Sequence, residues 1–185
     1  MASLTLHVDS VARRTMMRGR VDGSIAQAGE MRVRIGRTTA GSLARVRVGR
    51  LIEVRVGRLA TLSDVESLND AVRAAAGGAG HGAVICADYR RTKPFTGEVA
   101  GAWSQAMRRA NESIVRSAVL LNPSNTMFNL QVERVVHCAA NEQRRLFRDA
   151  KELQDWLEGI LTAAEREALR VFLSSGSGEE HAKSC

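Results

Sequence analysis

Ala83-Val84-Ile85-Cys86-Ala87 is an uninterrupted apolar run that ends at Asp88. A short apolar run without polar alternation is typical of a strand that is buried on both faces of a sheet. We interpret Cys86 as a small core residue of this strand, because an unpaired cysteine packs like a small hydrophobe. The run therefore predicts a central strand with helices on either side.

Upstream of this run, the sequence alternates between aliphatic residues and arginine with a period of two. The alternation covers residues 31–37, Leu43–Val48 and Leu51–Val56, and the Gly49-Arg50 pair suits a type II′ hairpin turn. Period-two alternation predicts half-buried antiparallel strands. We therefore expect an antiparallel hairpin at the N-terminal edge of the sheet.

Downstream, strands and helices alternate. Ser63 and Glu66 are spaced as a capping box, as are Thr162 and Glu165, and each pair predicts a helix start. A further helix is predicted from Thr96 to Asn111, with Val99, Trp103 and Met107 buried. A second is predicted from Met127 to Ala139, with Leu130, Val132, Val135 and Val136 buried. A third is predicted from Asp149 to Ile160. Two more strands are predicted at Ser117–Leu121 and Arg145–Phe147.

This order predicts one α/β domain at residues 31–173. Its sheet should be mixed, with four to six strands, an antiparallel hairpin near the N-terminus and helices on its flanks. Residues 1–30 are expected to be a basic, flexible extension. Residues 174–185 lack apolar side chains over most of their length and predict a disordered tail.

The pattern resembles the SpoIIAA-like or STAS family. The resemblance rests on Leu51–Val56, Leu62–Leu68 and Val84–Asp88, which are similar to the opening of such a domain. Arg145–Asp149 followed by Glu152–Leu157 is similar to a strand and helix of the STAS and SEC14-like subset. The resemblance covers about 120 residues, mostly core and capping positions, and implies a non-enzymatic regulatory module that binds another protein in bacterial signalling.

The resemblance fails at one functional position. Anti-sigma-factor antagonists of this family carry a phosphorylated serine at the start of the helix after the strand that ends in Asp. Here Thr96, Gly97 and Glu98 occupy that region. Thr96 could accept a phosphate and Glu98 could act as a permanent negative charge, although Thr96 is also a plain helix cap.

No catalytic or metal-binding pattern is found. His7, His81, His137 and His181 form none of the spacings typical of a metal site, and the three cysteines are widely separated. We therefore expect no enzyme activity, cofactor or metal. The absence of a long apolar run and of a signal-like N-terminus favours a cytoplasmic protein.

The best candidate interaction surface is the segment after the central strand. Asp88, Tyr89, Arg90, Arg91, Lys93 and Phe95 combine basic and aromatic side chains there. Ligands of open α/β sheets often bind beyond the carboxyl ends of the strands. The alternative is a solvated loop with Phe95 turned into the core. Arg144, Arg145 and Arg148 could extend the surface from the next strand.

Three functional hypotheses follow. The leading one is a protein-interaction module whose partner is another protein or a second copy of the chain, paired through the N-terminal edge strands. The second is a site for a lipid or small apolar ligand, as the SEC14-like resemblance implies. The third is binding of nucleic acid or an anionic surface through the arginines of residues 13–58, because residues 1–60 hold 12 arginines and 4 acids. Those residues contain no aromatic side chain for stacking on bases.

Overall fold

The computed structural model describes residues 41–78 and 82–176. Within these ranges five strands, β1 to β5, cover Leu43–Val48, Leu51–Arg55, Ala83–Asp88, Ile114–Leu120 and Arg144–Phe147. Five α-helices, α1 to α5, cover Leu62–Gly78, Gly97–Arg109, Thr126–Cys138, Ala150–Glu158 and Ala163–Ser174. A 3-10 turn at Asn111–Ser113 leads into β4, which begins at Ile114 and not at Ser117 as predicted.

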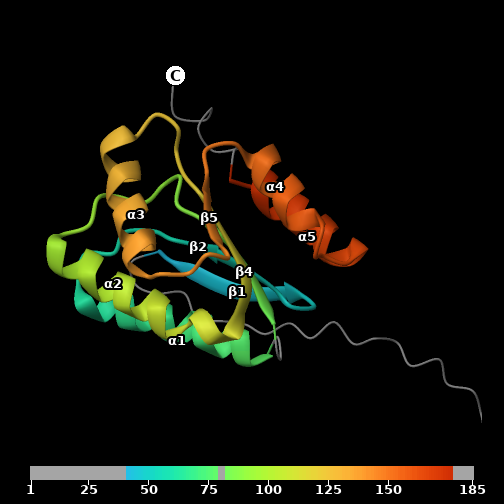
Figure 1. Cartoon of the computed structure of the whole chain (residues 1–185), viewed down its shortest axis with the longest axis horizontal. Helices are drawn as coiled ribbons and strands as arrows, with labels where there is room; N and C mark the ends of the chain where they lie inside the picture. Colours follow the sequence, from blue (N-terminus) through green and yellow to red (C-terminus); the bar gives the residue numbers. More distant parts are fainter. Residues whose placement is uncertain (1–40, 79–81, 177–185) are drawn as a thin grey trace, which may run out of the picture.

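The sheet is mixed, as the sequence predicts. The strands lie in the order β1-β2-β3-β4-β5, with β1 antiparallel to β2 and every later neighbour parallel. Parallel strands that follow one another in both chain and space are joined by crossovers of one hand. The crossover helices α1, α2 and α3 therefore cover one face, and α4 and α5 cover the other (Figure 1).

The central strand β3 is buried along its whole length. Its alternate residues belong to different cores: Ile85 and Ala87 pack under α1 to α3, whereas Val84 and Cys86 pack under α4 and α5. Because both faces are covered, neither could carry polar side chains, which explains the apolar run. Cys86 is a core residue as predicted, and burial raises the pKa of its thiol.

The turn between β1 and β2 is held by α5. Gly49 has φ 56°, a conformation that favours glycine. A Cβ atom on Gly49 would lie 2.4 Å from Oε1 of Glu165, so the site also has no room for a side chain. The same oxygen accepts a hydrogen bond from the backbone N–H of Arg50 at 2.8 Å. The predicted hairpin is thus fixed by a contact from the far end of the chain.

The predicted capping box at Ser63 and Glu66 is wrong. Helix α1 is capped two residues earlier, where the backbone N–H of Asp64 donates to Oγ1 of Thr61 at 3.2 Å and the Asp64 carboxylate accepts from Thr61 N at 3.0 Å. Asp64 thus accepts the hydrogen bond from the cap residue that a glutamate accepts in the usual capping box. The capping box of α5, formed by Thr162 and Glu165, is confirmed.

The predicted inner face of α3 is partly wrong. Phe128, Val132 and Val135 are buried, but Leu130 is 54% exposed. A helix turns by 100° per residue, so Leu130 lies nearly opposite the face that Phe128 and Val132 define. Met127 is also on the outer side and is 78% exposed.

Several predictions lie outside the described residues. They are the extension at 1–30, the strand at 31–37 and residues 177–185 of the predicted tail. Among the residues that are described, no helix is long and apolar enough to cross a membrane.

Candidate functional site

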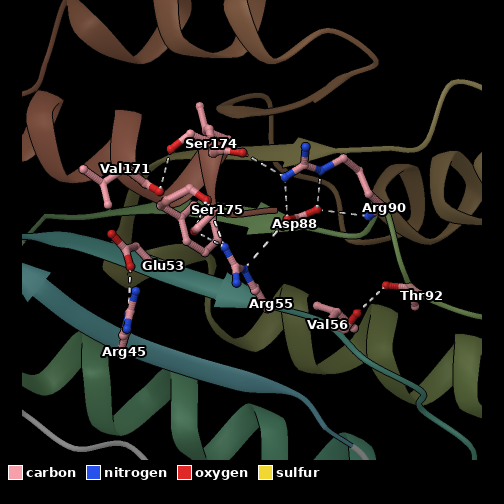
Figure 2. Close-up of polar contacts among 12 residues, drawn as sticks. Arg45, Glu53, Arg55, Val56, Asp88, Arg90, Thr92, Val171, Ser174 and Ser175 are labelled. Atoms are coloured by element: carbon pink, nitrogen blue, oxygen red, sulfur yellow. Dashed lines mark hydrogen bonds and ion pairs between the residues drawn. The ribbon is translucent and has the colours of Figure 1, made fainter. Parts of the chain in front are cut away.

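The candidate site is the edge of the sheet where β2, β3 and β4 end. Arg55, at the end of β2, is in register with Asp88, at the end of β3. The parallel arrangement brings these side chains together beside the end of α5 (Figure 2). The predicted segment from Asp88 to Phe95 begins here, and the structure divides its residues between the interior and the surface.

Asp88 and Arg90 form a close ion pair. The Asp88 carboxylate accepts from the backbone N–H of Arg90 at 3.1 Å, from its Nε at 2.9 Å and from its Nη2 at 2.9 Å. Arg90 Nη2 also donates to the carbonyl of Leu173 at 3.2 Å (Figure 2). Arg90 is therefore committed to contacts within the chain and ties the loop to α5.

Arg55 acts on the same helix end. Its Nη2 donates to the carbonyl of Phe172 at 3.0 Å and to Oγ of Ser175, and its guanidinium lies 5.0 Å from the centre of the Phe172 ring. Its Nε lies 3.9 Å from Asp88. Helix α5 has no basic residue in its own last turn. Arginines at the ends of β2 and β3 thus supply the cations that the carbonyl end of a helix favours.

Gly176, which follows α5, packs closely against this cluster of charged side chains. A Cβ atom on Gly176 would lie 1.9 Å from Nη2 of Arg90 and 2.8 Å from Oδ2 of Asp88. Only glycine fits here without displacing the ion pair. Gly176, just after α5, therefore lies at the same edge of the sheet as the predicted interaction loop.

Tyr89 and Phe95 are interior residues. The Tyr89 hydroxyl accepts a hydrogen bond from Nε1 of Trp103 at 2.7 Å, and burial raises the pKa of this hydroxyl. Phe95 packs edge-on against Phe128 with ring centres 5.4 Å apart. Phe95 therefore lies in the core, as the alternative prediction for this loop stated. Both rings anchor the loop and do not belong to its outer surface.

The loop is fastened at further points. Thr92 is buried and its hydroxyl donates to the carbonyl of Val56 at 2.6 Å. The side chain of Gln131, on α3, bonds both the N–H and the carbonyl of Phe95, at 2.8 and 2.7 Å. These bonds set a fixed backbone on which Arg91 and Lys93 are exposed.

Thr96 and Glu98 lie at the exposed start of α2. Oγ1 of Thr96 accepts from the backbone N–H of Val99 at 3.3 Å, so Thr96 caps the helix. Glu98 is exposed in the first turn. A phosphate on Thr96, or a standing negative charge at Glu98, stays a prediction.

The three arginines around β5 do not form one surface. Arg144 is buried, with 7% of its surface exposed. The guanidinium of Arg145 lies 5.3 Å from the centre of the Trp156 ring, and Arg148 pairs with Glu133 at 2.7 Å. They point into different parts of the molecule and do not extend the loop surface as a group.

Sequence reasoning missed Met127 and Leu130 on α3. The two residues stand on the side of α3 opposite its buried residues, at the same end of the sheet as the loop that Gln131 holds. The sequence does contain a signal for this, because the apolar residues of α3 fall on two opposite sides of the helix. Only one side can pack against the sheet, so the apolar residues of the other side are expected to be exposed. We name this candidate interaction surface the carboxyl-edge surface. It consists of five exposed residues: Arg91, Lys93, Pro94, Met127 and Leu130.

Within the described ranges no three residues among His, Cys, Asp and Glu are grouped as metal ligands would be. His137 and Cys138 are exposed at the end of α3, and Cys86 is buried. The other three histidines predicted as non-ligands lie outside the described residues.

Comparisons with known proteins concern the fold only. No family model and no curated protein matches this sequence. One solved structure that matches is an uncharacterized protein of the DUF3478 family from Shewanella loihica PV-4, described as having a SpoIIAA-like fold. It is 17% identical, with a TM-score of 0.46, over 63% of this chain and 91% of that chain.

Proposed function

We propose that this chain is a non-enzymatic, regulatory protein-interaction module of the STAS-like type, acting in bacterial signalling. Its carboxyl-edge surface would bind a partner protein that presents apolar and acidic side chains together. The observation that carries the proposal is the exposure of Met127 and Leu130, at 78% and 54%, on a helix that is otherwise packed by its opposite side.

The neighbouring loop supports a partner of this chemistry. Lys93 and Arg91 are exposed beside Pro94 on a backbone that Thr92 and Gln131 hold in place. A preordered loop loses little conformational entropy on binding. Exposed apolar residues at the same end of the sheet as exposed basic groups favour a partner segment with apolar and acidic side chains, because charge complementarity aids both orientation and encounter rate.

The test is capture of partners from the native cells by the tagged full chain. Met127→Ser with Leu130→Ser should reduce recovery of the bound protein at least tenfold, and Lys93→Glu should lower it further at low salt. Val115→Ser is the matched control, since Val115 is 43% exposed near the start of β4, at the opposite end of the sheet. Equal recovery by the surface variant and the control would show that the partner binds elsewhere.

The alternative functions have less support from the described residues. The cavity in the core is about 40 Å³, well below the roughly 300 Å³ or more of typical small-molecule sites. A larger hollow of about 490 Å³ between α2 and α3 lies open at the surface, and its lining includes Arg108, Gln131 and Arg134, so it does not enclose an apolar ligand. Arg45, Arg50 and Arg55 are engaged with Glu53, the Ile160 carbonyl and α5, so these three do not form an outward row for nucleic acid. Most arginines of residues 13–58 lie outside the described residues, and binding of nucleic acid through them stays a prediction.

Pairing of two copies through the N-terminal strands stays a prediction. In the described part of the chain, β1 is the edge strand of the sheet next to β2. Light scattering of the purified chain at several concentrations measures the mass directly. A monomer at all concentrations would exclude this mode of pairing.

A further inference from the structure

A small cavity lies between the sheet and helices α1 and α2. Its volume is about 40 Å³, and most of its lining is apolar. Four lining residues are polar: Asn69, Tyr89, Ser117 and Arg144. Of the described residues that line it, none is Asp or Glu. A cationic side chain thus borders a mostly apolar space whose described lining includes no carboxylate.

Arg144 is the unusual member of this lining. Its Nη2 donates to Oδ1 of Asn111 at 3.2 Å and to the carbonyl of Met107 at 3.5 Å, and its Nη1 is buried with no hydrogen-bond partner within the described ranges. Asn111 is held in turn, since its amide nitrogen donates to the carbonyl of Ala139 at 2.8 Å. The guanidinium is therefore positioned by one nitrogen and left unmatched at the other.

An unmatched buried guanidinium is costly. A buried charge is stable in proteins when a counter-charge or a full set of hydrogen bonds accompanies it. Arginine cannot relieve the cost by losing its proton at neutral pH. The structure therefore places a standing positive charge beside the cavity, and an acceptor that bears negative charge would compensate it.

Tyr89 adds a second donor to the same cavity. Its hydroxyl oxygen accepts from Nε1 of Trp103 at 2.7 Å, which leaves the hydroxyl proton for an acceptor. Tyr89 and Arg144 both line the cavity, one at the end of β3 and the other at the start of β5. Two donors around one apolar space match an anion better than a cation or an apolar molecule.

The cavity adjoins a pocket that opens toward the surface. This outer pocket has a volume of about 200 Å³ and shares Asn69, Val72 and Ile85 with the inner cavity. It adds Arg73 and Arg109, which are both exposed. No acidic residue is among the described residues that line the outer pocket. A mouth with basic side chains raises the local concentration of anions.

We propose that the cavity bordered by Arg144 and Tyr89 binds a small monovalent anion, either a halide or a carboxylate of one or two carbons. The size supports this class. A single buried water needs about 10–15 Å³ of such space, whereas a drug-sized ligand needs roughly 300 Å³ or more. The 40 Å³ of the cavity therefore suits an ion or molecule of a few atoms. This site is separate from the carboxyl-edge surface and does not depend on the proposed function.

The test uses the full chain in a chloride-free gluconate buffer at constant ionic strength. Bromide, formate and acetate are each titrated while the melting temperature is measured. At least one of these anions should raise the melting temperature by roughly 3–6 °C at ten times its Kd, and the rise should grow with the logarithm of the anion concentration. The anion that gives this rise at the lowest concentration binds most tightly, which tells halide from carboxylate.

The variants separate the site from a general salt effect. Arg144→Met removes the charge with little change of shape and should lose the rise. Arg145→Met, at the exposed neighbouring position, should keep it. A rise of equal size in Arg144→Met, or no rise beyond that of the gluconate buffer with any of the three anions, overturns the proposal.

A second measurement covers the case in which Arg144→Met does not fold. Crystals of the unmodified chain are grown or soaked in bromide, and anomalous scattering locates the ion. A peak beside Arg144 within reach of the Tyr89 hydroxyl supports the proposal. A water at that position in the bromide crystals, and also in crystals soaked in formate and in acetate, overturns it.

Discussion

At the scale of single residues, Glu165 connects two distant parts of the chain. One carboxylate oxygen accepts from Thr162 N at 2.8 Å, as the capping box predicts, and the other accepts from Arg50 N at 2.8 Å. Burial alone would raise the pKa of Glu165, but the hydrogen bonds from Thr162 and Arg50 outweigh it and lower the pKa. The carboxylate therefore stabilises the fold in its ionised form.

Replacing Glu165 with glutamine should change how stability depends on pH. The folded pKa lies below the ordinary value of 4.5, so the carboxylate contributes stability above that pH and loses it as pH falls through the folded pKa. Urea unfolding between about pH 6 and pH 3 should show a steeper loss of stability for the unmodified chain than for Glu165→Gln. Glu167→Gln, exposed on the same helix, is the control and should keep the steep loss. Parallel curves for all three proteins would contradict the prediction.

At the scale of elements, the end of α5 depends on side chains from the sheet. Arg55 and Arg90 donate to the carbonyls of Phe172 and Leu173, and α5 has no basic residue in its last turn. The sequence suggested Arg90 as an outward cation, because it follows a buried strand. Packing of α5 across that strand end turns it into an internal contact.

Arg55→Met should loosen the last turn of α5 while the rest of the fold persists. The lost hydrogen bond and the lost contact with Phe172 together should cost about 1–2 kcal/mol, reduced from buried values because Arg55 is partly exposed. Hydrogen exchange should become faster in α5 and stay unchanged in α4. Arg170→Met, which breaks only an exposed pair with Glu167, should leave both helices unaltered. Unchanged exchange in Arg55→Met would show that other contacts hold α5.

At the scale of the whole molecule, two cores meet on opposite faces of β3. Cys86 lies between β2 and β4 in the sheet and belongs to the core that α4 and α5 cover. Its side chain has no exposed surface, and burial raises the pKa of the thiol. Both effects protect it from reaction, because the thiolate is the reactive form.

Labelling of Cys86 should therefore report global unfolding. In a Cys138→Ala/Cys185→Ala background, Cys86 should react with a thiol reagent only at the rate at which the whole domain opens. Low concentrations of urea should speed the reaction in parallel with the loss of the folded population. Cys138, which is exposed, should react at once in the unmodified chain and serves as the internal reference. Fast labelling of Cys86 at a rate that does not change with urea concentration would contradict the prediction.

The sequence alone determined the features that depend on nearest neighbours along the chain. Periodicity and capping identified the β1–β2 hairpin, the buried strand β3, the helix start at Thr162 and the mixed α/β class. These patterns work because strand faces repeat every two residues and helix faces every three to four. The error at Ser63 arose because two overlapping capping patterns lie within six residues, and local spacing does not rank them.

Only the tertiary structure decided which of the candidate site residues face outward. Tyr89 and Phe95 turned inward because Trp103 and Phe128, on later helices, offer a hydrogen bond and a ring. Arg144 was buried and Arg90 was paired by contacts that a strand pattern does not contain. Leu130 was left outside because α3 packs with Phe128 and Val132. Such choices are set by the free energy of contacts between segments far apart in the chain. Local spacing shows that α3 has two apolar sides, but it does not tell which of them packs.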